Sequence, residues 1–454
     1  GSEMCIRDRA SNCSYGLVSS FVLLYLTGTL GLDSAIIGSL MLASKVLDGI
    51  SDVIFGTLID RTHSKLGKAR PWMLFGQVGV SLCLFLLFAI PAGSTTIQYI
   101  YFFIVYTALN AVFYTANGIA YSSLVALITK NNNERVQLGS FRFMFAVVTN
   151  IFMGFAVTGM VEKFGSGAAG WRTTALIFAI VGLVVNTISC LAVKELPEEE
   201  LSDNTSEAAE EGKAVAKEKK HGFAETAKIL IHNKYYLMIL AIYIVYYIMS
   251  NLTTGAGVFC ATYYWGDGSL LGQFSMMKMF PVIIALAIAP VLIKKTGSMQ
   301  KVNFWGYAIS SVLGIPMIYF AMQKNLSMFL LFMFIKGVFA GTLSGSLNAL
   351  IAEASGYTTR TTGVHMDGMM YSCSSLGVKV GGGIGTAAVG WLLKLGGFVG
   401  TATVQSESAI RMIFNLYITF PFVIGIIITV LLAFLDVEKA NKKWDAEHQK
   451  EAQA

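Results

Sequence analysis

Charged residues are scarce in this chain. Asp, Glu, Lys and Arg make up 13% of its 454 residues, about half of the ~25% that soluble globular domains carry. Hydrophobic residues make up 55%, and the mean hydropathy is +0.62. Apolar runs of about 20 residues, each long enough to cross a ~30 Å hydrocarbon core, recur along nearly the whole length. The composition therefore excludes a soluble globule and predicts an all-α integral membrane protein.

Reactive and metal-binding sequence patterns are also missing. The six cysteines lie mostly inside apolar runs, without metal-binding spacing or a disulfide pattern, so we interpret them as small packing residues. The sequence holds no Walker A motif, no HExxH and no Ser-His-Asp arrangement. We therefore expect neither an enzyme nor a cofactor. The net charge of +6 comes from loops and tails and does not indicate a nucleic-acid partner.

The apolar runs number twelve, and a polar segment divides them into two groups of six. The first group begins near Ser11, Ser34, Trp72, Gln98, Val136 and Trp171, and the second near Tyr235, Leu270, Val302, Ser327, Thr362 and Ala409. The segment between them is rich in charge and too polar to bury a core, which predicts a flexible linker. Six spans, a linker and six spans is the layout of a transporter built from two pseudo-repeated bundles.

These runs predict five regions. They are residues 1–10, a non-native cloning or assembly scar without the apolar core of a signal peptide; 11–194, an N-terminal six-helix bundle; 195–234, a cytoplasmic linker; 235–436, a C-terminal six-helix bundle; and 437–454, a cytoplasmic tail. Lys and Arg are concentrated in the loops that follow even-numbered runs, which by the positive-inside rule places both termini in the cytoplasm. We expect a multi-pass protein of the bacterial inner (plasma) membrane.

The second apolar run contains three charged residues, in the stretch KVLDGISD. Lys45, Asp48 and Asp52 are spaced three and four apart, so they share one helical face. Each costs about 2.5–3.5 kcal/mol at mid-membrane, so this face is expected to avoid lipid. The two carboxylates repel, and Lys45 offsets only part of their charge. A proton or a monovalent cation would relieve the repulsion, and Ser51 adds an oxygen ligand that suits Na⁺. The alternatives are an ion pair that only locks helices together, or a residue near the end of the run that extends its side chain to the membrane surface.

The segment that follows, GTLIDRTHSKLGKARPW, carries a family resemblance. Its Gly-x-x-x-Asp-Arg pattern with basic residues resembles the loop signature of the major facilitator superfamily. With the paired aspartates upstream and Lys-x-Arg-Pro-Trp downstream, the chain resembles the glycoside–pentoside–hexuronide:cation symporters, the family of melibiose permease, over essentially its whole length. The resemblance implies the major facilitator fold, with twelve transmembrane helices in two six-helix bundles. It also implies a monomer in which Asp48 and Asp52 bind the coupling cation, Na⁺ or H⁺.

The same resemblance implies roles for further residues. Thr115 matches a hydroxyl that ligates the cation, and the acid that contacts sugar in that stretch of the family is replaced by Gly118 here. The residues implied or considered for sugar binding are Asn12, Asn117, Tyr121, Arg142, Ser375 and Lys379. For Asn117 and Tyr121, helix packing is an equal alternative.

Ionic and gating roles are implied as well. Lys379 also matches the family lysine that links the sugar and cation sites, and its expected partners are Asp48 and Asp52. The alternative is that Lys379 forms a purely structural salt bridge. Lys45 is a second residue expected to form a salt bridge. Arg142 could instead extend its side chain to the cytoplasmic surface. Lys278 and Lys336 could likewise extend their side chains to a membrane surface. The residues expected at the cytoplasmic gate are Asp60, Arg61, Arg70 and Glu353.

The function expected from this reading is cation-coupled symport of a sugar by alternating access. A symporter of another amphipathic solute, such as a lysolipid, is the nearest alternative. A membrane sensor that does not transport is an alternative of a different class. The sequence does not choose among a glycoside, a pentoside and a hexuronide, or between Na⁺ and H⁺, although Ser51 and Thr115 favour Na⁺.

Overall fold

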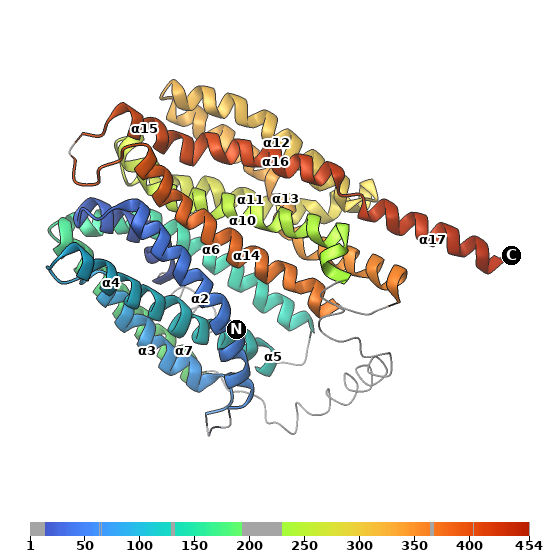
Figure 1. Cartoon of the computed structure of the whole chain (residues 1–454), viewed down its shortest axis with the longest axis horizontal. Helices are drawn as coiled ribbons and strands as arrows, with labels where there is room; N and C mark the ends of the chain where they lie inside the picture. Colours follow the sequence, from blue (N-terminus) through green and yellow to red (C-terminus); the bar gives the residue numbers. More distant parts are fainter. Residues whose placement is uncertain are drawn as a thin grey trace. The chain divides into compact units, whose positions relative to one another are not determined.

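The computed structural model describes residues 14–62, 64, 66–128, 132–192, 229–363, 367–402 and 404–453 (Figure 1). All regular secondary structure in these ranges is helical. Asn12 and nearly all of the predicted linker lie outside them. The backbone is described at Asp60 and Arg142, whereas their side chains are not among the described ones.

The first half of the chain forms the six helical spans that the sequence predicts. A helix at Ser14–Thr29 ends in the π-turn η1 (Tyr25–Thr29), and it is followed by α2 (Ser34–Asp60) and α3 (Arg70–Leu87). The fourth span joins α4 (Thr95–Thr107), the π-helical turn η2 (Ala108–Tyr114) and α5 (Thr115–Ile128) without a break. The fifth and sixth spans are α6 (Asn132–Lys163) and α7 (Gly167–Ala192).

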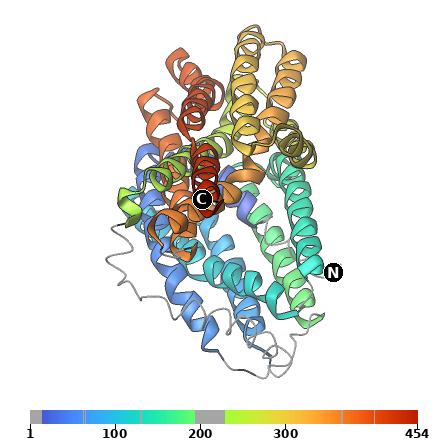
Figure 2. The same ribbon diagram turned by 90° about the vertical axis from the view of Figure 1, so that its right-hand side faces the viewer.

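The second half forms six more spans. They are α10 (Lys234–Phe259) with η3 (Cys260–Tyr264), α11 (Leu270–Thr296), α12 (Met299–Met322), α13 (Leu326–Thr362), α14 (Asp367–Leu395), and α15 (Glu407–Phe414) continued by η4 (Asn415–Thr419) and α16 (Phe420–Phe434). A last helix, α17 (Val437–Gln453), occupies the predicted tail and points towards the viewer in Figure 2. In the described residues, ten helices are long and apolar enough to cross a membrane, besides the shorter Ser14–Thr29; α2, which carries Lys45, Asp48 and Asp52, is not among these ten.

The helix ends follow local sequence signals. Asp33 precedes α2, and its Oδ1 accepts a hydrogen bond from the Ala35 amide at 2.9 Å. Ser298 and Asn325 cap α12 and α13 in the same way. These caps satisfy amide groups that have no partner within the helix. Gly363 ends α13 at φ +69°, a left-handed conformation that favours glycine.

The chain packs as two compact units that do not follow the two halves of the sequence. Unit 1 comprises Gly1–Glu207, Leu252–Ser275 and Thr386–Tyr417, and unit 2 comprises Ala208–Asn251, Met276–Gly385 and Ile418–Ala454. The helices α10, α11 and α14 are therefore each divided between the units. The bundle boundaries expected from the sequence stay a prediction.

In unit 1, the C-terminal end of α14 packs closely on the N-terminal end of α2. Ser34 Oγ donates a hydrogen bond to the Gly390 carbonyl at 2.9 Å, and Lys394 Nζ lies 2.5 Å from Asp33 Oδ2. Burial alone would raise the pKa of the Asp33 carboxyl. The hydrogen bonds from Lys394 and from the Ala35 and Ile36 amides outweigh burial, so the pKa of Asp33 is lower than usual. These contacts hold the first loop of the chain against α14.

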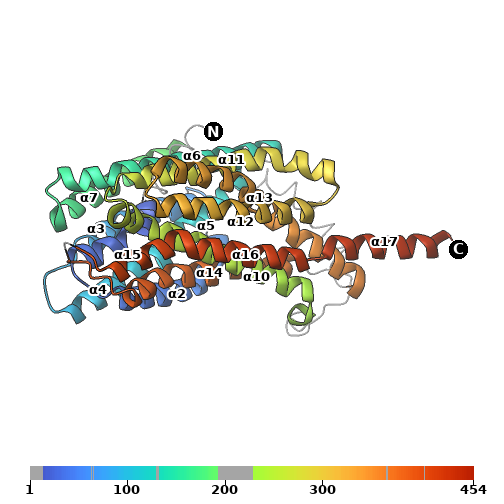
Figure 3. The same cartoon turned by 90° about the horizontal axis from the view of Figure 1, so that it is seen from above.

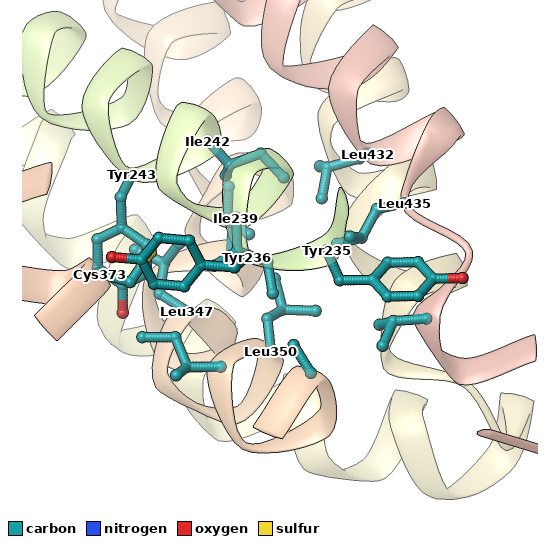
Figure 4. Close-up of a cluster of buried hydrophobic side chains, with 14 of the residues drawn as sticks. Tyr235, Tyr236, Ile239, Ile242, Tyr243, Leu347, Leu350, Cys373, Leu432 and Leu435 are labelled. Carbon is teal, nitrogen blue, oxygen red and sulfur yellow. The ribbon is translucent and has the colours of Figure 1, made fainter. Parts of the chain in front are cut away.

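Unit 2 has its own apolar core. In it α12 packs against α13 and α16, and the three run side by side (Figures 1 and 3). Below them, α10 contributes a face of tyrosine and isoleucine side chains to a buried cluster (Figure 4). The labelled members of this cluster are Tyr235, Tyr236, Ile239, Ile242, Tyr243, Leu347, Leu350, Cys373, Leu432 and Leu435. This core holds α10, α13 and α14 together. Of these helices, α13 carries Glu353, and α14 carries Ser375 and Lys379.

Candidate functional site

Asp48 and Thr115 meet inside unit 1, although they are 67 positions apart in the sequence. Thr115 Oγ1 donates a hydrogen bond to Asp48 Oδ1 at 2.6 Å, and it also lies 2.8 Å from the Asn110 carbonyl oxygen. Asp48 and Thr115 are each only 6% exposed. The π-turn η2 ends where α5 begins at Thr115, and it directs this hydroxyl towards α2. The structure thus brings together two of the residues expected to bind the cation.

The rest of KVLDGISD surrounds the same carboxylate. Lys45 Nζ lies 3.7 Å from Asp48 Oδ2, so one carboxylate oxygen faces an ammonium group and the other faces a hydroxyl. Ser51 Oγ donates to the Asp48 backbone carbonyl at 2.9 Å, which directs this hydroxyl back to its own helix. Asp52, one turn further along α2, is half-buried. Lys45 therefore forms the ion pair expected of it, whereas the Ser51 hydroxyl points away from the Asp48 carboxylate.

The donor set fits a monovalent cation. Among the described residues, no three His, Cys, Asp or Glu side chains gather in the way that would hold a metal ion. The helix α2 contributes two carboxylates one turn apart, those of Asp48 and Asp52, and α5 contributes the Thr115 hydroxyl. Backbone carbonyls of the helices lie nearby. Hard oxygen donors of this kind suit Na⁺, and the carboxylates alone suit H⁺.

Asn117 and Tyr121 lie in the packing of unit 1. Asn117 is 3% exposed, and its Nδ2 donates to Gln77 Oε1 at 2.9 Å. Tyr121 is 4% exposed and belongs to an apolar cluster with Met73 and Leu124. Both side chains therefore have the surroundings of packing residues. Helix packing was the alternative that the sequence left open for Asn117 and Tyr121. Their assignment to sugar binding gains no support from these contacts.

A buried polar network between α3, α5 and α7 was not expected from the sequence. Gln77 extends the Asn117 contact towards Ser81, whose Oγ donates to the Ala179 carbonyl at 2.9 Å. Asn186 Nδ2 similarly bonds the Met73 carbonyl at 3.1 Å. The available signal was the four-residue spacing of Gln77 and Ser81 in an otherwise apolar helix.

Replacing Asn117 tests this reading. Asn117→Ala leaves the buried Gln77 amide without the partner it has now, which costs about 1–3 kcal/mol. We expect a lower thermal unfolding temperature in detergent with an unchanged KM for sugar uptake. Asn117→Asp is the matched comparison of similar size. A raised KM without loss of stability would instead place Asn117 at the sugar.

Lys379 and Ser375 share one face of α14 in unit 2, four positions apart. The opposite face is made of glycines packed against α10: a Cβ on Gly381 would lie 2.4 Å from the Ile244 carbonyl oxygen, and one on Gly385 2.6 Å from that of Ile248. This close packing turns the Lys379 face away from α10. Ser375 is exposed and Lys379 half-buried. The pairing of Lys379 with the aspartates of α2, which belong to the other unit, stays a prediction.

Two of the expected gate residues, Arg70 and Glu353, have local partners. Arg70 Nε donates to the Cys190 carbonyl at 2.9 Å and ties the start of α3 to the end of α7. Glu353 Oε2 accepts from Asn441 Nδ2 at 2.9 Å, which ties α13 to α17. Arg360 strengthens the same junction through Asp445, 3.2 Å away. Arg61 is exposed at the end of α2. A gating role for these residues stays a prediction.

Comparisons with known proteins agree on one family. A family model described as "MFS/sugar transport protein" matches residues 8–439. The isoprimeverose transporter of Lactiplantibacillus pentosus is 26% identical, over 99% of this chain and 91% of that protein. The glucuronide carrier protein homolog of Escherichia coli (strain K12) is 23% identical, over 86% and 82%. Among solved structures, a D-xylose–proton symporter aligns with a TM-score of 0.65 at 12% identity, over 95% and 97% of the two chains. That likeness confirms the expected major facilitator fold.

Proposed function

Because the chain belongs to the MFS/sugar transport protein family, we propose that it is a multi-pass membrane symporter that carries a sugar together with Na⁺ or H⁺. The observation that carries the coupling part is the Asp48 carboxylate, buried in a membrane helix between Thr115 and Lys45. Relatives named for isoprimeverose and glucuronide support a sugar substrate. These relatives and the family are transporters, not enzymes, in agreement with the sequence analysis.

In this proposal the coupling ion is held where Asp48 now accepts a hydrogen bond from Thr115. A hydroxyl has one proton and two lone pairs. Thr115 can turn its proton to the Asn110 carbonyl, 2.8 Å away, and offer a lone pair to a cation at Asp48. Asp52 would complete the site from the next turn of α2. Neutralising the pair would favour sugar binding, and by linkage sugar must raise the affinity for the cation by the same factor.

The sugar site and the membrane setting complete the proposal. We assign sugar contacts to Lys379 and Ser375 on the α14 face that is turned from α10, together with Asn12 and Arg142. The basic residues at the ends of α11 and α13, Lys294, Lys295 and Arg360, support the predicted orientation with cytoplasmic termini. A monomer in the bacterial inner membrane is the expected state.

The test is uptake into proteoliposomes that contain the purified protein. Labelled glycosides, pentosides and glucuronides are offered with an inward Na⁺ gradient, an inward H⁺ gradient or neither. We expect one class of sugar to accumulate above equilibrium under one of the gradients and not without it. Folded protein that accumulates none of these sugars under either gradient would contradict the proposal.

A further inference from the structure

Five exposed lysines gather around the turn between α11 and α12 in unit 2. The Nζ of Lys442, on α17, donates to the Gly297 carbonyl of this turn at 3.1 Å. Lys439 lies one turn before Lys442 on the same side of α17. Three further lysines lie within four positions of Gly297 along the chain. This lysine cluster consists of Lys294, Lys295, Lys301, Lys439 and Lys442.

The cluster has little acidic charge beside it. Residues 268–352 contain no Asp or Glu. The carboxylate of Glu438 is buried, where it accepts hydrogen bonds from the Ser298 hydroxyl and, at 2.9 Å, from the Gln300 amide. Further acids of the tail are in ion pairs with other basic residues: Asp436, Asp445 and Glu447. None of the five lysines forms an ion pair with a residue in the described ranges.

The cluster lies at the depth of lipid head groups. Lys294 is the twenty-fifth residue of α11, which at 1.5 Å per residue places it about 36 Å from the start of the helix. This is beyond the ~30 Å hydrocarbon core and within the ~40–45 Å that includes the head groups. Lys301 is the third residue of α12, the next span, so it lies at the same membrane face.

Exposed apolar side chains continue from the lysines towards the membrane centre. Val291 and Leu292 lie one turn before Lys295 on α11. Trp305 lies one turn after Lys301 on the same face of α12. Tryptophan is enriched at membrane–water interfaces, because its ring is amphipathic. This surface thus presents ammonium groups at head-group depth and apolar side chains one turn deeper.

We propose that the lysine cluster binds the head group of an anionic phospholipid whose acyl chains lie against Val291, Leu292 and Trp305. Each lysine near an anionic membrane surface raises the binding constant about fivefold. Phosphate oxygens accept charge-assisted hydrogen bonds from ammonium groups, and the negative charge relieves the repulsion among the lysines. The inference goes beyond the proposed function, since it depends on neither the sugar nor the coupling ion.

The bound lipid also favours the docked position of the tail. Two of the five lysines belong to α17, which continues from α16 past the end of α11 (Figures 1 and 3). The Glu438 contacts bring these two lysines to the α11–α12 turn. A lipid that binds the assembled cluster therefore stabilises the folded protein.

The test is the thermal unfolding temperature of the purified protein in a neutral detergent, titrated with phosphatidylglycerol or with phosphatidylcholine. We expect phosphatidylglycerol to raise this temperature at a lower concentration than phosphatidylcholine does. Added salt should weaken the effect, because it screens exposed charges. Inorganic phosphate, which carries the charge without acyl chains, should have little effect.

Paired substitutions test the lysines themselves. Lys295→Gln/Lys301→Gln removes two charges from exposed side chains that make no hydrogen bond or ion pair in the described ranges. The phosphatidylglycerol concentration for half of the full shift should rise about tenfold or more. Lys295→Arg/Lys301→Arg should keep the original value. Lys163→Gln/Lys443→Gln removes two exposed lysines outside the cluster, so this matched control should behave like the unaltered protein.

Three results would overturn the inference. The first is an equal shift with both lipids in the unaltered protein, and the second is an equal loss in the Gln pair and the control pair. The third is a shift with inorganic phosphate as large as that with phosphatidylglycerol, which would show that the lysines bind a free anion. If the Gln pair does not fold, the single variant Lys301→Gln and the lipid comparison in the unaltered protein decide the question.

Discussion

We expect Asp48→Asn to abolish the cation dependence of sugar uptake while the protein still folds and reaches the membrane. The substitution keeps the side-chain shape and an oxygen that can accept the Thr115 hydroxyl now 2.6 Å away, but it removes the negative charge that a cation needs. In the ion-bound protein, Asp48 and the cation form a buried charge pair. Removing one partner of such a pair costs about 3–5 kcal/mol, which corresponds to more than a hundredfold in cation affinity. The measurement is sugar binding or uptake titrated with Na⁺ and with H⁺.

Further variants test whether the loss of cation dependence comes from the proposed cation site. Asp52→Asn should also weaken or abolish cation-stimulated uptake, because the second carboxylate lies one turn along the same face of α2. Thr115→Val removes the hydroxyl and should weaken a Na⁺ response, whereas Thr115→Ser should preserve it. Glu407→Gln, at the exposed start of α15, is the control for loss of a carboxylate. Unchanged coupling in both aspartate variants would rule out the KVLDGISD site.

The second large effect is expected at Gly381. An alanine Cβ there would lie 2.4 Å from the Ile244 carbonyl oxygen and 3.0 Å from Tyr247 Cβ. Both are closer than ordinary van der Waals contact, and the first involves backbone that cannot rotate away. Overpacking of this kind costs about 1–3 kcal/mol. Gly381→Ala should therefore lower the thermal unfolding temperature in detergent and reduce uptake, since Lys379 and Ser375 lie on the helix that must shift.

The matched control is Gly356→Ala in α13 of the same unit. A Cβ at Gly356 meets no atom within 4 Å, so the same substitution has open space there. Alanine also has a better helix propensity than glycine. Gly356→Ala should leave stability unchanged or raise it. Equal unfolding temperatures for the two variants would show that α10 and α14 do not depend on this close packing.

Much of the fold could be predicted from the sequence because it rests on local properties. Each of the twelve apolar runs coincides with a helical span, since the length of a run and its hydropathy decide whether it can cross a bilayer. α2 begins at Ser34, α11 at Leu270 and α10 at Lys234, within one residue of the expected starts. The spacing within KVLDGISD likewise placed Lys45 and Asp48 on one face, and the two do pair.

The partners across helices could not be predicted in this way. Gln77 and Asn117 are 40 positions apart, and their hydrogen bond depends on how α3 and α5 pack. Periodicity specifies which residues share a face, but it does not specify what that face meets. The same limit applies to Asn441, which lies in a polar tail by composition and bonds Glu353 in the structure.

The sequence by itself determined a twelve-span membrane protein, its family resemblance, and the face of α2 that bears the carboxylates. It did so because hydropathy, periodicity and motif spacing are written along the chain. The tertiary structure alone decided that Thr115 reaches Asp48 and that Asn117 is held by Gln77. Those pairings depend on the close approach of helix backbones, which is set by the side chains of both partners together and is encoded in neither segment alone.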